Sequence, residues 1–131
     1  MHRSLFAFLA VVAAAAVTLG GASRARAIDT PSADTVARGR YIVRQVGMCT
    51  DCHGLTLMGG KLAVTWRPDV AAAELAPKIA GLPGYTAEGA VRFLETGIAR
   101  NGKNLRPPMP AYRLKPDDAA AVVAYLRSLQ P

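Results

Sequence analysis

Two cysteines and a histidine lie together in the segment Cys49-Thr50-Asp51-Cys52-His53. Thiols and imidazoles exchange disulfides, add to electrophilic carbon and ligate transition metals. Four kinds of site use two cysteines at this spacing: a thioredoxin-like redox pair, a zinc site, a simple disulfide, and covalent haem attachment. In the last, both thiols bond to the haem vinyl groups and the histidine that follows becomes an axial iron ligand.

The rest of the chain favours covalent haem over the other three sites. The chain contains only two cysteines and two histidines, His2 and His53, whereas a closed zinc site needs about four ligands. A thioredoxin-like pair begins a helix after a strand, but here the pair follows a predicted helix. We therefore predict Cys49 and Cys52 as the covalent haem anchors and His53 as the proximal iron ligand. A thiol redox or metal-binding module remains the alternative with the weakest support.

Residues 1–27 have the composition of a secretory signal peptide. The start is basic at residues 1–3, residues 5–19 are apolar and uncharged, and Ala-Arg-Ala at 25–27 is typical of a cleavage site. The apolar run is shorter than the roughly 20 residues of a membrane span. We expect cleavage after Ala27, a periplasmic domain of residues 28–131, and no membrane span once the signal is removed. An uncleaved membrane anchor is the alternative.

The net charge of the chain is a weak indicator of nucleic-acid binding. Of the formal charge of +7, three arginines lie within residues 1–27, which contain no acid, so the remaining domain carries +4. Neither an arginine-rich helix nor an aromatic stacking platform is evident in the sequence. We therefore expect no nucleic-acid partner. The length allows one compact domain.

A first helix is predicted from about residue 33 to residue 46. Ser32 or Asp34 can cap its first turn, because either side chain accepts bonds from free N–H groups. Small and apolar residues recur at helical spacing along one face: Val36, Gly39, Val43 and Val46.

Two more helices are predicted in the second half of the chain. One is capped by Thr86 and ends near Gly97, and the other begins at Pro116, which suits the first turn of a helix. The buried face of the last helix is expected to contain Ala119, Val122, Tyr125, Leu126 and Leu129. A short helix is possible at residues 71–79, and no strand is evident. The pattern predicts an all-α fold.

Together these features resemble mono-haem members of the class I cytochrome c family. The resemblance rests on the glycine-bearing helix before the Cys-Thr-Asp-Cys-His segment, the middle helix, the loop Arg106-Pro-Pro-Met-Pro-Ala-Tyr112, and the last helix. It implies a cytochrome c-like fold, with three to four helices around one covalently bound haem and its iron. It further implies electron transfer rather than enzymatic catalysis.

The chain is similar in particular to the cytochrome c subunits of periplasmic dehydrogenases. This similarity implies redox protein partners: a dehydrogenase as electron donor and a cytochrome or oxidase of the respiratory chain as acceptor. A haem enzyme with an open distal site is the alternative function.

The second axial ligand must be another residue type, because His53 is the only histidine after residue 27. Three methionines remain. Met48 adjoins the attachment segment, and Met58 follows His53 too closely to cross to the opposite face of a haem. Met109 lies far downstream between prolines, which restrict the backbone that presents its thioether. The family resemblance points to the same residue, so we predict Met109 as the distal iron ligand.

Other roles concern the surroundings of the haem. Haem propionates need hydrogen-bond donors, and Trp66, Arg106 and Tyr112 are candidates. The family resemblance implies a close helix contact between Gly39 and Tyr125. Basic residues around the Met109 loop are expected to steer an acidic partner: Arg100, Lys103, Arg106, Arg113 and Lys115.

Overall fold

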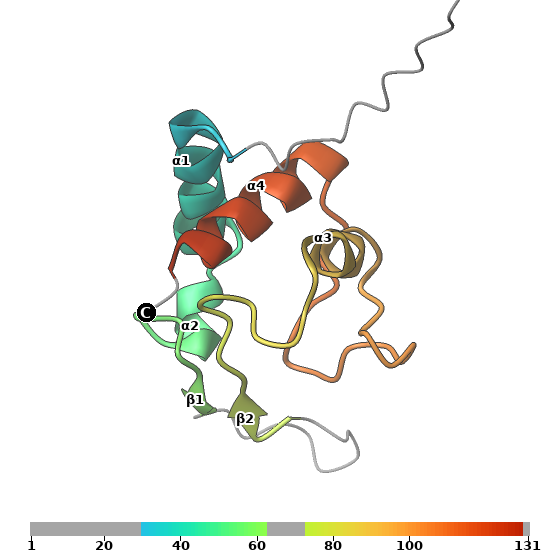
Figure 1. Cartoon of the computed structure of the whole chain (residues 1–131). Helices are drawn as coiled ribbons and strands as arrows, with labels where there is room; N and C mark the ends of the chain where they lie inside the picture. Colours follow the sequence, from blue (N-terminus) through green and yellow to red (C-terminus); the bar gives the residue numbers. More distant parts are fainter. Residues whose placement is uncertain (1–29, 63–72, 130–131) are drawn as a thin grey trace, which may run out of the picture.

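The computed structural model describes residues 30–62 and 73–129. The predicted signal segment 1–27 and Trp66 lie outside these ranges. Within them, no helix is long and apolar enough to span a membrane. The elements in chain order (Figure 1) are α1 (Ala33–Tyr41), the π-helix η1 (Ile42–Val46), α2 (Cys49–His53), β1 (Gly60–Lys61), β2 (Leu75–Ala76), α3 (Ala87–Thr96) and α4 (Pro116–Ser128).

The first helix is capped by Ser32, whose hydroxyl accepts a bond from the Thr35 N–H at 3.1 Å. After α1 the chain continues as η1, where the Gly47 N–H bonds to the Ile42 carbonyl at 2.7 Å. This wider π turn shifts the direction of the side chains that follow it. Of the residues at helical spacing, Val43 is buried, whereas Val46 at the end of η1 is 59% exposed.

Helices α1 and α4 approach closely at Gly39. A Cβ atom on Gly39 would lie 1.9 Å from the Ala121 carbonyl oxygen and 2.8 Å from the Tyr125 Cβ. Only glycine permits such an approach of two helix backbones. The predicted contact between Gly39 and Tyr125 is therefore confirmed.

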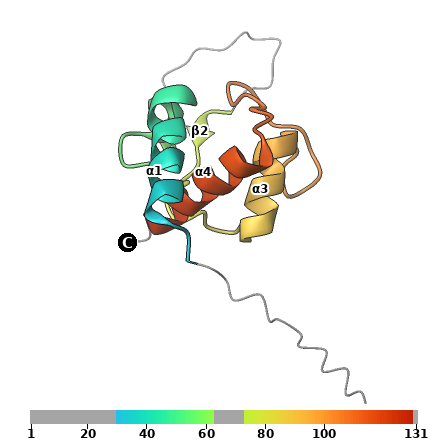
Figure 2. The same cartoon turned by 90° about the horizontal axis from the view of Figure 1, so that it is seen from above.

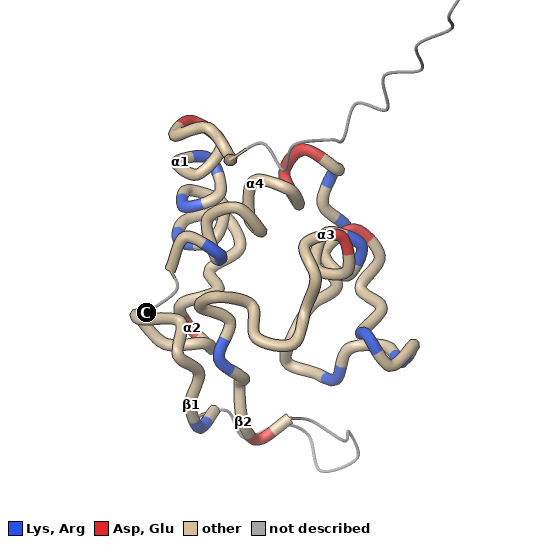
Figure 3. The backbone as a smooth tube through the Cα atoms, viewed as in Figure 1, with Lys and Arg blue, Asp and Glu red and all other residues tan. Residues whose placement is uncertain are grey.

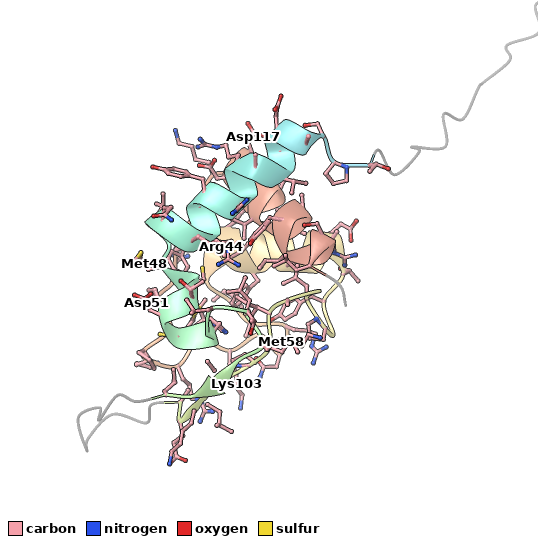
Figure 4. All side chains as sticks on the ribbon, turned by 90° about the vertical axis from the view of Figure 1, so that its left-hand side faces the viewer. Arg44, Met48, Asp51, Met58, Lys103 and Asp117 are labelled. Atoms are coloured by element: carbon pink, nitrogen blue, oxygen red, sulfur yellow. The ribbon has the colours of Figure 1, made fainter. Side chains whose placement is uncertain are left out.

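Arg44 connects α4 to the segment that follows the cysteine pair. Its Nε donates to the Tyr125 hydroxyl at 2.7 Å, and a terminal nitrogen donates to the Leu55 carbonyl at 3.3 Å. Figure 4 shows this side chain lying between the helices. The guanidinium thereby helps to fix the cysteine segment relative to the paired helices.

The sequence predicted both later helices correctly. Thr86 caps α3 by accepting a bond from the Gly89 N–H at 3.0 Å, and α3 ends at Gly97, whose φ of 70° is left-handed. Helix α4 begins at Pro116 as predicted. Its expected inner face is buried at Ala119, Val122, Tyr125 and Leu126 and half-buried at Leu129.

The short helix suggested for residues 71–79 is wrong for residues 73–79, which are extended or irregular. Here Leu75–Ala76 pairs antiparallel with Gly60–Lys61, so the expectation of no strand is also wrong. Gly59 explains the pairing: its φ is 80°, and a Cβ there would lie 2.4 Å from the Ala76 carbonyl oxygen. The close approach across the pair overrides a weak local preference for helix.

Helix α4 lies between α1 and α3 in both cartoon views (Figures 1 and 2). The buried core joins α4 to η1 and to two loop residues. Its members are Ile42, Val43, Leu57, Ala80, Val122, Tyr125 and Leu126. This arrangement is mainly helical, as predicted, and several of the same core residues also line a cavity: Ile42, Val122 and Leu126.

Candidate haem site

A cavity of about 360 Å³ lies beside α3 and α4 and brings distant parts of the chain together. Cys49 and His53 line it from α2, and Met109 lines it from the loop before α4. Much of the remaining wall is apolar, including Ile42, Leu82, Phe93, Leu94, Val122 and Leu126. Its size and apolar lining are typical of a cofactor pocket.

The cysteine segment forms the single helical turn α2. One turn places residues three apart on the same side of a helix, which brings Cys49 and Cys52 together. Both are half-buried and they form no disulfide. A second cavity of about 70 Å³ is lined by both cysteines, His53 and Met109. Burial raises the pKa of the Cys49 thiol, which favours its protonated form.

His53 is buried, and the position of its ring is fixed by the main chain. Its Nδ1 lies 2.8 Å from the carbonyl oxygen of Pro77. A carbonyl can only accept, so Nδ1 carries the proton and donates it. The unprotonated Nε2 is then the nitrogen available to a metal.

The three methionines of the described residues differ in their access to this site. Met109 is half-buried and lines both cavities. Met48 lines only the smaller cavity and is 49% exposed, while Met58 lines neither and is 52% exposed. Figure 4 shows Met48 and Met58 flanking the α2 region. Of these three methionines, only Met109 lines the larger cavity.

These donors fit a haem better than they fit a zinc ion. Two cysteines, one histidine and one methionine line the smaller cavity, and all of them except Cys52 also line the larger, largely apolar one. In the described part of the chain, no three His, Cys, Asp or Glu side chains gather as a metal site. Anchors for two vinyl groups and two axial donors are the set that a covalent haem requires.

The family model for cytochrome c matches residues 36–130. The chain belongs to the cytochrome c family. It is also 32% identical over 119 residues to the "Gluconate 2-dehydrogenase cytochrome c subunit" of Pantoea cypripedii, an alignment that covers 84% of this chain and 27% of that protein. The chain thus spans about a quarter of the length of this curated relative.

Membership of this family establishes an electron-transfer protein with covalently bound haem c and its iron. The predicted resemblance to cytochrome subunits of dehydrogenases is likewise confirmed. Cys49 and Cys52 stand in the Cys-x-x-Cys-His pattern that haem c attachment requires.

The predicted propionate contacts of this cytochrome c differ in their surroundings. Arg106 is exposed and lines the larger cavity, so its guanidinium has room to reach a carboxylate. Tyr112 lines both cavities, but its hydroxyl donates its one proton to the carbonyl oxygen of Gly47. Burial, with Cys49 beside the ring, raises the pKa of Tyr112 to about 12. Both contacts stay predictions.

Figure 3 shows basic residues both along α1 and on the loops beyond α3. One of them, Arg100, donates to the Gly84 carbonyl, and its guanidinium lies 5.8 Å from the centre of the Tyr85 ring. The predicted basic rim consists of exposed residues: Arg100, Lys103, Arg106, Arg113 and Lys115. Because Arg106 also lines the cavity, the rim adjoins the site.

Proposed function

We propose that this cytochrome c transfers single electrons from a periplasmic dehydrogenase to a cytochrome or oxidase of the respiratory chain. Cys49 and Cys52 anchor the haem, and His53 and Met109 are its axial ligands. The strongest support is that His53 and Met109 line one cavity although the whole of α3 separates them in the chain.

The bound haem supplies an iron that alternates between its ferric and ferrous states. The chain's residues set the conditions for this change. The bond from His53 Nδ1 to the Pro77 carbonyl fixes the tautomer and orientation of the imidazole. The soft thioether of Met109 favours the ferrous state and raises the reduction potential. The apolar wall limits the access of water.

The proposed ligand set is tested by changing Met109 to alanine. The wild-type ferric protein should show the weak long-wavelength absorbance band of methionine-ligated haem. Met109→Ala should lose this band, and its reduction potential should fall by on the order of 0.1 V, a fraction of the range that axial ligands control.

Met58→Ala is the matched control, because this methionine is exposed and lines neither cavity. The control should keep both the band and the potential. A wild-type protein with high-spin ferric iron, no such band and unhindered cyanide binding would instead support the haem protein with an open distal site.

The donor is proposed to be a dehydrogenase because the relative from Pantoea cypripedii is named as a cytochrome c subunit of one. Export is proposed on the composition of residues 1–27. N-terminal sequencing of the haem-containing protein from a periplasmic fraction should begin at Ile28. Recovery of the haem protein in membranes with residues 1–27 still attached would show that they serve as an anchor.

A further inference from the structure

We infer that the Tyr112 hydroxyl latches the loop carrying Met109 to the segment carrying the haem-anchoring cysteines, and so keeps Met109 in place as a ligand. The inference rests on the proposed ligation by Met109. It assigns Tyr112 the role of a positioning residue, distinct from the propionate contact considered above.

The Met109 loop has little regular structure to hold it. Residues 105–115 contain no helix or strand. Within residues 30–62 and 73–129, two main-chain bonds attach this loop to its surroundings: the Ala73 N–H donates to the Pro107 carbonyl at 2.8 Å, and the Leu114 N–H donates to the Leu94 carbonyl at 3.1 Å. Neither partner lies in the segment that carries the cysteines, so neither bond joins the loop directly to α2.

Tyr112 supplies that link through its side chain. It follows Met109 by three residues, and its hydroxyl donates to the carbonyl of Gly47, two residues before Cys49. The ring lies against this residue: a Cβ on Gly47 would lie 3.5 Å from a Tyr112 ring carbon, an ordinary van der Waals contact.

The acceptor lies at a break between two helices. Gly47 ends η1, and Met48 adopts left-handed backbone angles, with φ of 49°, before α2 begins. The carbonyl oxygen of Gly47, at this break, accepts the hydrogen bond from the Tyr112 hydroxyl. The bond therefore joins the proposed distal loop to the point from which the haem-anchoring turn starts.

Such a bond affects how often the ligand leaves the iron. A neutral thioether is displaced when its loop opens, and segments with few bonds open most readily. A typical net hydrogen bond changes an equilibrium by about fivefold. Loss of the Tyr112 hydroxyl should raise the population of open loop by about this factor, which in turn raises the apparent affinity for an added ligand.

Tyr112→Phe removes the hydroxyl and keeps the ring. Titration of the ferric protein with imidazole should give an apparent affinity about fivefold tighter than that of the wild type. Without imidazole, the long-wavelength band should remain. Tyr125→Phe is the matched control, because it removes a hydroxyl bonded to Arg44 in the contact between η1 and α4. It should lower stability towards urea but leave the imidazole affinity unchanged.

The outcomes separate the latch from the ligand assignment. Equal imidazole affinity in Tyr112→Phe and wild type, or an equal rise in both tyrosine variants, overturns the latch while leaving Met109 as ligand. Absence of the band from wild-type protein overturns the ligand assignment and, with it, the latch.

If Tyr112→Phe fails to assemble with haem, the wild-type ferrous protein decides by NMR. A slowly exchanging Tyr112 hydroxyl proton with a nuclear Overhauser effect to the Gly47 α-protons supports the latch. Absence of that effect overturns it.

Discussion

At the scale of single residues, main-chain carbonyls hold the side chains of the site. His53 donates to the carbonyl of Pro77, and Tyr112 donates to that of Gly47. The contiguous Cys-x-x-Cys-His pattern is readable in a sequence because its chemistry resides in side chains. A carbonyl acceptor has no such signature, because every residue type carries one. The sequence therefore suggested Tyr112 as a propionate donor and did not reveal its bond to Gly47.

The raised pKa of the Tyr112 phenol predicts that the protein loses stability in alkaline solution. Burial, the largest cause, raises its pKa from 10.0 to about 12. Between these values the folded protein binds its proton more tightly than the unfolded chain does, so the free energy of unfolding falls as the pH rises. Below about pH 10 the contribution is fully present. Urea denaturation from pH 8 to pH 12, roughly spanning this window, measures the slope.

Tyr112→Phe provides the comparison, because other tyrosines and lysines titrate in the same range. The variant should lose part of the slope between about pH 10 and pH 12. Identical slopes in the two proteins would contradict the raised pKa.

At the scale of elements, local sequence signals determine where the helices begin. Contacts between residues far apart in the sequence determine the other elements. Ser32, Thr86 and Pro116 mark helix starts through chemistry confined to one turn. The π turn of η1 and the strand at Leu75–Ala76 have no comparable local cause. The strand requires a partner some fifteen residues earlier and a glycine that lets the two backbones meet. These determinants lie far apart in the sequence, so a local sequence pattern does not predict the strand.

The α1–α4 contact predicts a large difference between two glycine substitutions. Gly39→Ala would place a methyl group 1.9 Å from the Ala121 carbonyl oxygen, so the helices must separate. We expect a loss of about 3 kcal/mol or more in the free energy of unfolding, at the upper end for overpacking. Urea denaturation of the haem protein measures the loss.

Gly89→Ala is the control, since this glycine is also helical but its added Cβ would meet only Thr86 Oγ1 at 3.1 Å and a Tyr85 ring carbon at 3.9 Å. Its stability should stay within about 1 kcal/mol of wild type, because alanine favours the helix and the tight contact offsets part of that gain. Equal losses in the two variants would mean that the close approach does not govern stability.

At the scale of the whole molecule, one group of basic residues, the rim, adjoins the site, while α1 carries other arginines. The basic rim belongs to loops beyond α3, whereas α1 lies on the other side of α4 in both cartoon views. Arg106 belongs to the rim and to the cavity wall at once. A negatively charged reactant approaching this side meets the field of the rim close to the proposed haem.

The rim predicts that electron transfer to an anionic oxidant slows as salt is added. The rate of oxidation by ferricyanide should fall between low ionic strength and about 0.15 M, where the screening length is about 8 Å. Arg106→Gln should weaken this dependence. Stopped-flow absorbance of the haem measures the rate.

Arg40→Gln removes one exposed charge from α1 and serves as the control. It should leave the salt dependence nearly as in wild type. Equal effects of the two substitutions would show that total charge, rather than the rim, controls the encounter.

The bond between His53 and the Pro77 carbonyl limits which substitutions can alter the surroundings of the His53 imidazole. No side-chain replacement at residue 77 can delete the acceptor, because the oxygen belongs to the backbone. The bond is altered only by moving the chain that carries it. That chain is positioned by its approach to Gly59, where an added Cβ would lie 2.6 Å from the Pro77 carbonyl carbon. The orientation of the His53 imidazole, the proposed iron ligand, thus depends on the absence of a side chain at Gly59, six residues further along the sequence.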